Sequence, residues 1–226
     1  MLVPVPKQLQ ALVKFWESTG NRDKTCRTIQ YFAKFLAFYY ASHQDKQDLV
    51  KRFESLSSNL SMSRKAFRLL KTIDFYVKLA MLWNKTGKQD PVALTLDSAT
   101  NIFYGLYLAC DSYTWAARIK LIHDPQSNRV TRQGNFFWLF AILSSLIHNG
   151  VKISMHWDKK RRSKEDARQV DQVPETLYVS LLKDAFDLLI PLSLNQYGPW
   201  YPNSGLCGLL GTVSSLLGVY QGWPSV

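Results

Sequence analysis

The sequence is poor in acidic residues compared with basic ones. Its 226 residues include 28 Lys or Arg and only 17 Asp or Glu, which gives a formal net charge of +11 at pH 7. This imbalance indicates an anionic partner, namely nucleic acid, an acidic protein or anionic lipid. Hydrophobic residues make up 46% of the chain and charged residues 20%, so the composition argues against wholesale disorder.

Residue patterns that mark metal sites and enzymes are also missing. The three cysteines, Cys26, Cys110 and Cys207, lie too far apart for a CxxC zinc or redox motif. Their odd number, in apolar surroundings, is typical of buried thiols in a reducing compartment. The four histidines are scattered, without Cys or Glu at metal-ligand spacing: His43, His123, His148 and His156. No GxGxxG, P-loop or GxSxG motif occurs, so we expect no enzyme activity, no metal and no cofactor.

Both ends of the sequence lack a targeting signal of the common kinds. The start, MLVPVPKQLQ, has no long apolar stretch after a basic segment, so we expect no secretory signal peptide. The end, GWPSV, is not an SKL-type address for import into the peroxisome lumen. Long β-type alternation and internal repeats are absent as well, and the sequence therefore predicts an all-α fold.

Charge divides the chain into two parts. Residues 1–90 contain 16 basic and 7 acidic residues, whereas residues 91–226 contain 12 and 10. We interpret residues 1–90 as a basic amphipathic helical module and residues 91–226 as apolar, membrane-embedded helices, separated by the turn KTGKQDP at 85–91. Pro191 is expected to interrupt the end of one helix. The expected helices cover roughly residues 7–18, 24–42, 46–60, 63–81, 92–122, 134–155, 177–194 and 206–220.

No uninterrupted apolar run reaches the roughly 20 residues that span a bilayer. Residues 134–153 and 206–223 come close, and we interpret both as membrane segments, with a buried helix of a soluble bundle as the alternative. A charged loop at 156–174, which contains KKRRSK at 159–164, follows the first of them. In the second, small residues recur every four positions and predict a flat face for helix packing and oligomerisation: Ser214, Gly218 and Gly222.

The predicted helix at 63–81 is both basic and amphipathic. One continuous arc without charge is expected to insert into lipid: Ala66, Leu69, Leu70, Ile73, Tyr76, Val77, Ala80 and Met81. Five bases lie opposite or beside that arc and are expected to bind lipid headgroups: Arg64, Lys65, Arg68, Lys71 and Lys78. Neighbouring like charges are unfavourable in water but favourable at an anionic surface. A core-facing helix and a helix that binds nucleic acid or acidic protein are the alternatives.

Three stretches in order resemble the peroxisomal membrane-elongation proteins, the peroxin-eleven family. They are NRDKTCRTIQYFAK at 21–34, SRKAFRLLK at 63–71, and LLKDAFDLLIPL at 181–192 followed by GLLGTVSSLLGVY at 208–220. The resemblance covers most of the chain. Many members have Gly where this chain has Leu70, but Leu70 deepens the apolar arc, so we expect the helix to continue through it.

The resemblance implies an integral protein of the peroxisomal membrane that elongates the organelle before fission and proliferation. It implies an N-terminal module that faces the cytosol, self-association, and contact with the dynamin-related fission GTPase and its membrane adaptors. A pore for small metabolites is the alternative function. Asp97, Asn101 and Asp111 could line such a path, or their helix could be partly solvated and pair with Arg118 and nearby bases. We expect an anionic phospholipid partner and no nucleic acid, since KKRRSK beside apolar helices is more often a juxtamembrane loop.

Overall fold

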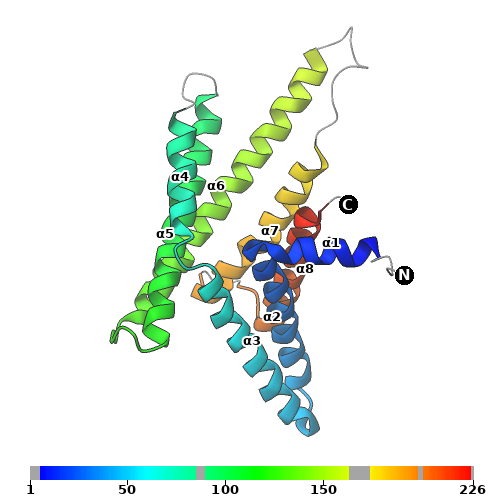
Figure 1. Cartoon of the computed structure of the whole chain (residues 1–226), viewed down its shortest axis with the longest axis vertical. Helices are drawn as coiled ribbons and strands as arrows, with labels where there is room; N and C mark the ends of the chain where they lie inside the picture. Colours follow the sequence, from blue (N-terminus) through cyan, green and yellow to red (C-terminus); the bar gives the residue numbers. More distant parts are fainter. Residues whose placement is uncertain (1–5, 85–89, 163–173, 198–200, 225–226) are drawn as a thin grey trace, which may run out of the picture.

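The computed structural model describes residues 6–84, 90–162, 174–197 and 201–224, and these residues form helices and connections without a strand. This confirms the predicted all-α class (Figure 1). The elements are α1 (Lys7–Glu17), α2 (Thr19–Ala41), η1 (Gln44–Lys46), α3 (Gln47–Phe67), α4 (Thr72–Trp83), α5 (Pro91–Arg118), α6 (Ser127–Arg162), α7 (Glu175–Asn195) and α8 (Ser204–Gly222).

The helices from the two ends of the chain pack together rather than apart. Helix α2 packs along α3 and along α8, while α4 packs on α5. Helix α6 packs between α5 and α7, and α7 packs on α8. Figure 1 shows α1 lying across the others and the α2–α3 hairpin projecting away from the upper ends of α4 and α6. Residues before and after position 90 therefore contribute to one bundle.

A small core lies where α2, α6, α7 and α8 meet. Its buried members are Tyr31, Trp138, Ile142, Ile190 and Cys207. Many large apolar side chains elsewhere remain exposed, on every α-helix of the described chain, although α3 contributes only Leu56 and Phe67. So much exposed apolar surface is unusual for a protein surrounded by water alone and fits a lipid-facing exterior.

The prediction of one continuous helix at 63–81 is wrong. Helix α3 runs through Ser61 and Ser63 to Phe67, and α4 begins only at Thr72. Between them Leu70 adopts a left-handed conformation with φ of 61°. That conformation costs a residue with a Cβ about 1–2 kcal/mol, and it redirects the chain between the two helices.

Two interruptions predicted for other helices are wrong as well. Helix α6 continues to Arg162, so residues 156–162 are helical rather than part of a loop, because Lys and Arg are good helix formers. Residues 163–173 of that predicted loop lie outside the described residues. Helix α7 passes through the buried Pro191 and ends at Asn195, where Gln196 is left-handed. Packing against the core outweighs the single hydrogen bond that Pro191 removes.

Within the described residues, one helix is long and apolar enough to cross a membrane. It lies in α6 at Ser127–Asp158 and contains the predicted membrane segment 134–153. Only 28% of its most apolar stretch is buried by the rest of the chain, so most of that stretch is available to lipid. Helix α8, the other predicted membrane segment, does not reach the same apolarity because glycine and serine are frequent in it.

Candidate membrane-facing surface and central basic cavity

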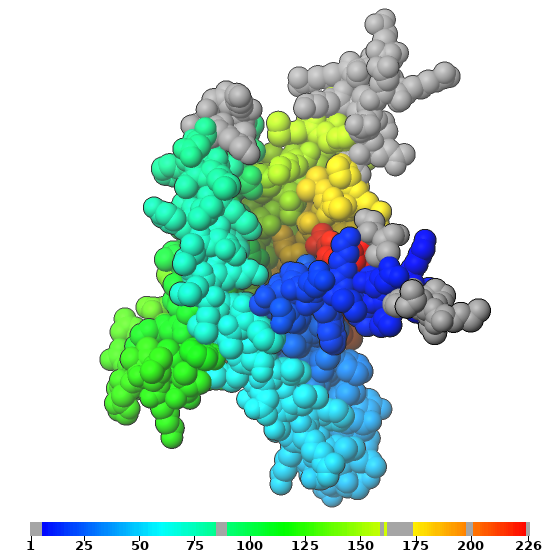
Figure 2. Space-filling model, in the orientation of Figure 1, coloured from blue at the N-terminus to red at the C-terminus, as the bar shows by residue number. Residues whose placement is uncertain are grey.

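The apolar arc predicted to insert into lipid lies on the outside of the molecule. We call its exposed part the apolar surface, which consists of Leu69, Leu70, Ile73, Tyr76, Val77, Ala80 and Met81. Leu70 and Tyr76 are each 74% exposed, and Figure 2 shows α4 at the edge of the molecule. Ala66, which belongs to α3, is only half-exposed. Because no described segment covers the apolar surface, it is free to meet a membrane.

The side of helix α4 opposite the apolar surface packs on α5. The Phe75 ring stacks on Tyr104 of α5 with centroids 5.6 Å apart, and Phe75 also lies against Gly105. The Thr72 hydroxyl donates a hydrogen bond to the Gly105 carbonyl, at 3.4 Å. Phe75 therefore anchors α4 on α5. The wider apolar arc is thereby left outside.

Arg64, by contrast, is turned into the protein. It is 7% exposed, and its Nε lies 3.0 Å from Asp23 Oδ1 on α2. Its Nη1 donates to Gln30 Oε1 at 2.7 Å. Burial lowers the pKa of Arg64, and the neighbouring Arg68 lowers it further. A buried guanidinium of this kind depends on its carboxylate, so Arg64 fixes α3 against α2.

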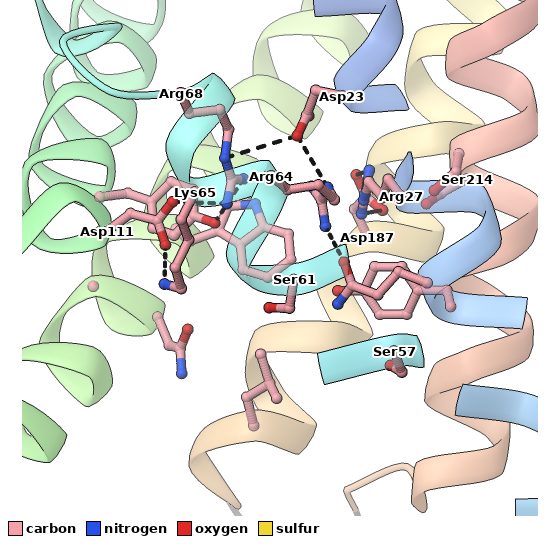
Figure 3. A pocket seen from close by; sticks show the side chains of 18 of the residues that line it. Asp23, Arg27, Ser57, Ser61, Arg64, Lys65, Arg68, Asp111, Asp187 and Ser214 are labelled. Carbon is pink, nitrogen blue, oxygen red and sulfur yellow. Dashed lines mark hydrogen bonds and ion pairs between the residues drawn. The ribbon is translucent and has the colours of Figure 1, made fainter. Parts of the chain in front are cut away.

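Lys65 and Arg68 share a single carboxylate on α5. Lys65 Nζ pairs with Asp111 Oδ1, and Arg68 Nη2 lies 2.7 Å from Asp111 Oδ2. Arg68 Nη1 also donates to the Tyr107 hydroxyl at 3.2 Å. Figure 3 shows Asp23 and Asp111 on either side of these bases. The sequence alternative in which Asp111 pairs with nearby bases is therefore correct, although Lys65 and Arg68 are the partners.

The five predicted headgroup bases do not share one solvated side. The break between α3 and α4 turns Arg64, Lys65 and Arg68 inward, where internal acids hold them. Lys71 is half-buried and Lys78 is exposed, with its Nζ 4.9 Å from the Phe75 ring centroid. Headgroup binding stays a prediction for all five, but in this conformation Lys78 has the freest access.

A further ion pair, which the sequence analysis missed, joins α2 to α7. Arg27 donates from both terminal nitrogens to Asp187, at 2.6 and 3.1 Å. The guanidinium also lies over the rings of Tyr31 and Trp138, at 5.4 and 6.0 Å. Both partners occur in stretches that carry the family resemblance, at 21–34 and 181–192, and that shared occurrence was the available signal.

The small residues of α8 pack within the chain. Cβ atoms built at Gly208 and Gly211 would approach Phe35 and Tyr31 of α2 to 2.6 and 2.4 Å, so α2 contacts the helix closely there. Ser214 is fully buried, and Gly218 faces Lys24 with more room. Gly222 lies near Asn21 of α2. Gly218 and Gly222 of the predicted face therefore meet α2, Ser214 is buried in the bundle, and oligomerisation through this face stays a prediction.

A large cavity lies among the helices around these ion pairs. It measures about 1010 Å³, and residues of α2, α3, α5 and α8 supply most of its wall (Figure 3). Ten basic and four acidic side chains line it, so we call it the central basic cavity. Asp111 is in its wall, but Asp97 and Asn101 are not. Asp97 instead lies 3.3 Å from His148 Nε2, so the residues predicted to line a pore are not brought together.

No cluster of three potential metal ligands occurs within residues 6–84, 90–162, 174–197 and 201–224. The all-helical fold, the span-length apolar helix and the exposed apolar surface define a helical membrane protein. The family model described as peroxisomal biogenesis factor 11 (PEX11) matches residues 9–223, and the chain belongs to that family.

The chain is similar to relatives from distant organisms along nearly its whole length. It is 28% identical to peroxisomal membrane protein PMP27 of Saccharomyces cerevisiae, over 94% of this chain and 93% of the relative. The identity is 24% to peroxisomal biogenesis factor 11 of Schizosaccharomyces pombe, with the same coverage of both chains. It is 23% to peroxisomal membrane protein 11B of Homo sapiens, over 93% and 95%. No solved structure matches the chain.

Proposed function

We propose that this protein resides in the peroxisomal membrane and promotes its curvature, elongation and fission during peroxisome proliferation. Membership of the peroxisomal biogenesis factor 11 family supports the general role. The observation that carries the mechanism is the apolar surface of residues 69–81, which no described part of the chain covers. The protein inserts this surface into one leaflet as a wedge.

The apolar surface is large enough to bind stably at the boundary between lipid headgroups and acyl chains. Full burial of one large aliphatic or aromatic side chain contributes at most about 1.5–3 kcal/mol, and several such side chains are available. Side chains inserted at this depth expand one leaflet relative to the other, and this difference favours bending of the membrane. Lys71 and Lys78 lie on the same segment, and each base near an anionic surface adds on the order of 1 kcal/mol.

The ion pairs make the wedge part of a rigid body. Arg64 connects α3 to α2, and Asp111 connects the end of α3 to α5. Helix α5 packs on α6, the helix that can span a membrane. In this arrangement Arg64, Lys65 and Arg68 position the apolar surface. They would bind headgroups only after leaving Asp23 and Asp111, which is costly for buried charges.

The family resemblance supports three further parts of the proposal. The N-terminal module faces the cytosol, copies of the chain self-associate, and the dynamin-related fission GTPase and its membrane adaptors are partners. Many wedges on the same side of a membrane favour curvature together, so self-association strengthens the effect. A metabolite pore is the second candidate, and the central basic cavity favours it, although Asp111 lines that cavity and Asp97 and Asn101 do not.

The experiment is to express the full-length Leu69→Glu/Ile73→Glu variant in cells and measure peroxisome length and number. Both side chains are exposed, so the fold should be retained. We expect short peroxisomes with the protein still in the membrane fraction after alkaline extraction. Ile119→Glu/Leu121→Glu is the control, since these exposed apolar residues lie outside the apolar surface. Normal elongation by the Leu69/Ile73 variant would refute the mechanism.

A further inference from the structure

The central basic cavity has more positive charge than its own acids neutralise. Its ten bases exceed its four acids by six. Three of those acids, Asp23, Asp111 and Asp187, are already in ion pairs with Arg64, with Lys65 and Arg68, and with Arg27. The other six bases of the wall have no ion pair with these three acids. A volume of about 1010 Å³ is at the upper end of what ligand pockets in proteins enclose, roughly 300–1,000 Å³.

Three of these bases form what we call the lysine cluster: Lys24 of α2, Lys71 of the α3–α4 turn and Lys183 of α7. Lys24 Nζ donates only to the neutral Asn21 Oδ1, at 3.3 Å, and Lys183 pairs with Asp184 at 2.7 Å. In the part of the chain that the structure describes, neither Lys24 nor Lys71 has an ion pair with a carboxylate. Burial lowers the pKa of Lys24, and Lys183 and then Lys71 lower it further. Lys24 thus lies close enough to both Lys183 and Lys71 to be repelled by their charges.

The cavity wall also has hydrogen-bond donors without a full set of acceptors. Arg68 Nε is buried and has no hydrogen-bond partner among the described residues, since Asp23 Oδ1 is 4.0 Å away. Ser57 and Ser61 of α3 line the same space, and Figure 3 shows both near the ion pairs. A buried donor without an acceptor is costly, and an anionic ligand would supply one.

We propose that the central basic cavity binds a phosphate group at the lysine cluster, carried either by an anionic phospholipid or by a free phosphate compound. A phosphate monoester has about −1.5 to −2 charges and three strong acceptor oxygens, so one group can engage several cations. A carboxylate offers less charge and fewer acceptor sites for three separated lysines. The volume leaves room for the organic part of the ligand. This inference does not depend on membrane remodelling.

Such a ligand would bridge three helical segments. Lys24, Lys71 and Lys183 come from different parts of the chain, so a phosphate held by all three stabilises the packing of α2, the α3–α4 turn and α7. A ligand that binds only the folded state raises the unfolding temperature with its concentration. Binding can therefore be followed by thermal unfolding without any assay of peroxisome shape.

The experiment uses the full-length protein in two settings. In neutral detergent, inorganic phosphate is titrated at constant ionic strength with chloride, and the unfolding temperature is read from tryptophan fluorescence. In nanodiscs, phosphatidylcholine alone is compared with phosphatidylcholine containing phosphatidic acid. The test variant is Lys24→Gln/Lys71→Gln. The control is Lys14→Gln/Lys51→Gln, which removes the same charge from exposed positions outside the cavity. Lys71→Gln alone serves if the double variant does not fold.

We expect a saturable rise in unfolding temperature for the wild type and the control. The test variant should bind about tenfold or more weakly, because it loses charge-assisted hydrogen bonds. A response to inorganic phosphate identifies a free phosphate compound as a sufficient ligand, whereas a response only to phosphatidic acid identifies a lipid headgroup. The proposal is overturned if neither phosphate source gives a saturable rise, or if the test and control variants respond equally.

Discussion

Asp111 holds two buried bases, so its removal is the sharpest test of the internal ion pairs. Asp111→Asn keeps the shape of the side chain but leaves Lys65 and Arg68 without their shared carboxylate. All three side chains are at most 14% exposed. Removal of one partner from a buried ion pair costs about 3–5 kcal/mol. A chain of this size loses roughly 2–4 °C of unfolding temperature per kcal/mol, so we expect a fall of about 10 °C.

The assay is thermal unfolding of purified full-length protein in neutral detergent, followed by circular dichroism. Asp74→Asn is the matched control, because Asp74 is exposed on α4 and the chemical change is the same. We expect the control to shift stability by no more than about 0.5 kcal/mol. Adding Lys65→Met to Asp111→Asn should recover part of the loss by removing one stranded charge. Equal unfolding temperatures for Asp111→Asn and Asp74→Asn would refute the reasoning.

Two further pairs of substitutions test the α3–α4 turn and the contact between α2 and α8 by the same unfolding assay. Leu70→Gly should leave stability unchanged or raise it, because it removes about 1–2 kcal/mol of left-handed strain. Ile73→Gly, at an exposed helical position, should cost about 1 kcal/mol. A larger loss of stability for Leu70→Gly than for Ile73→Gly would show that residue 70 is helical. Gly208→Ala should destabilise by about 1–3 kcal/mol because its Cβ meets the Phe35 backbone at 2.6 Å. Gly218→Ala should be tolerated, because the nearest atom to a Cβ built there, in Lys24, is 3.7 Å away. Equal losses of stability for Gly208→Ala and Gly218→Ala would place the close helix contact elsewhere.

Helix content and helix positions were predictable from apolar spacing, and the error lay in the connections. The stretch SRKAFRLLKTIDFYVKLA satisfies a single helical wheel, so nothing in its periodicity marks a break. The only signal was Leu70, where many family members have Gly, the residue that best tolerates a left-handed conformation. We interpreted Leu70 as deepening the arc, but it adopts that conformation at a strain cost.

Three of the bases in that stretch were assigned the wrong surroundings. The apolar arc is exposed, as expected of a lipid-inserting surface, while Arg64, Lys65 and Arg68 are internal. Their partners lie on α2 and α5, and a helical wheel contains no information about such distant contacts. The same limit hid the pair of Arg27 and Asp187, which are 160 positions apart.

The most direct test of the central claim is reconstitution of full-length protein into liposomes of rising anionic lipid content, with vesicle shape followed by electron microscopy. The account predicts tubules with the wild type and with Ile119→Glu/Leu121→Glu. It predicts round vesicles with Leu69→Glu/Ile73→Glu at equal protein incorporation. Tubules of the same length and number with the Leu69/Ile73 variant would contradict the account, because the apolar surface would then not be the part that bends the membrane.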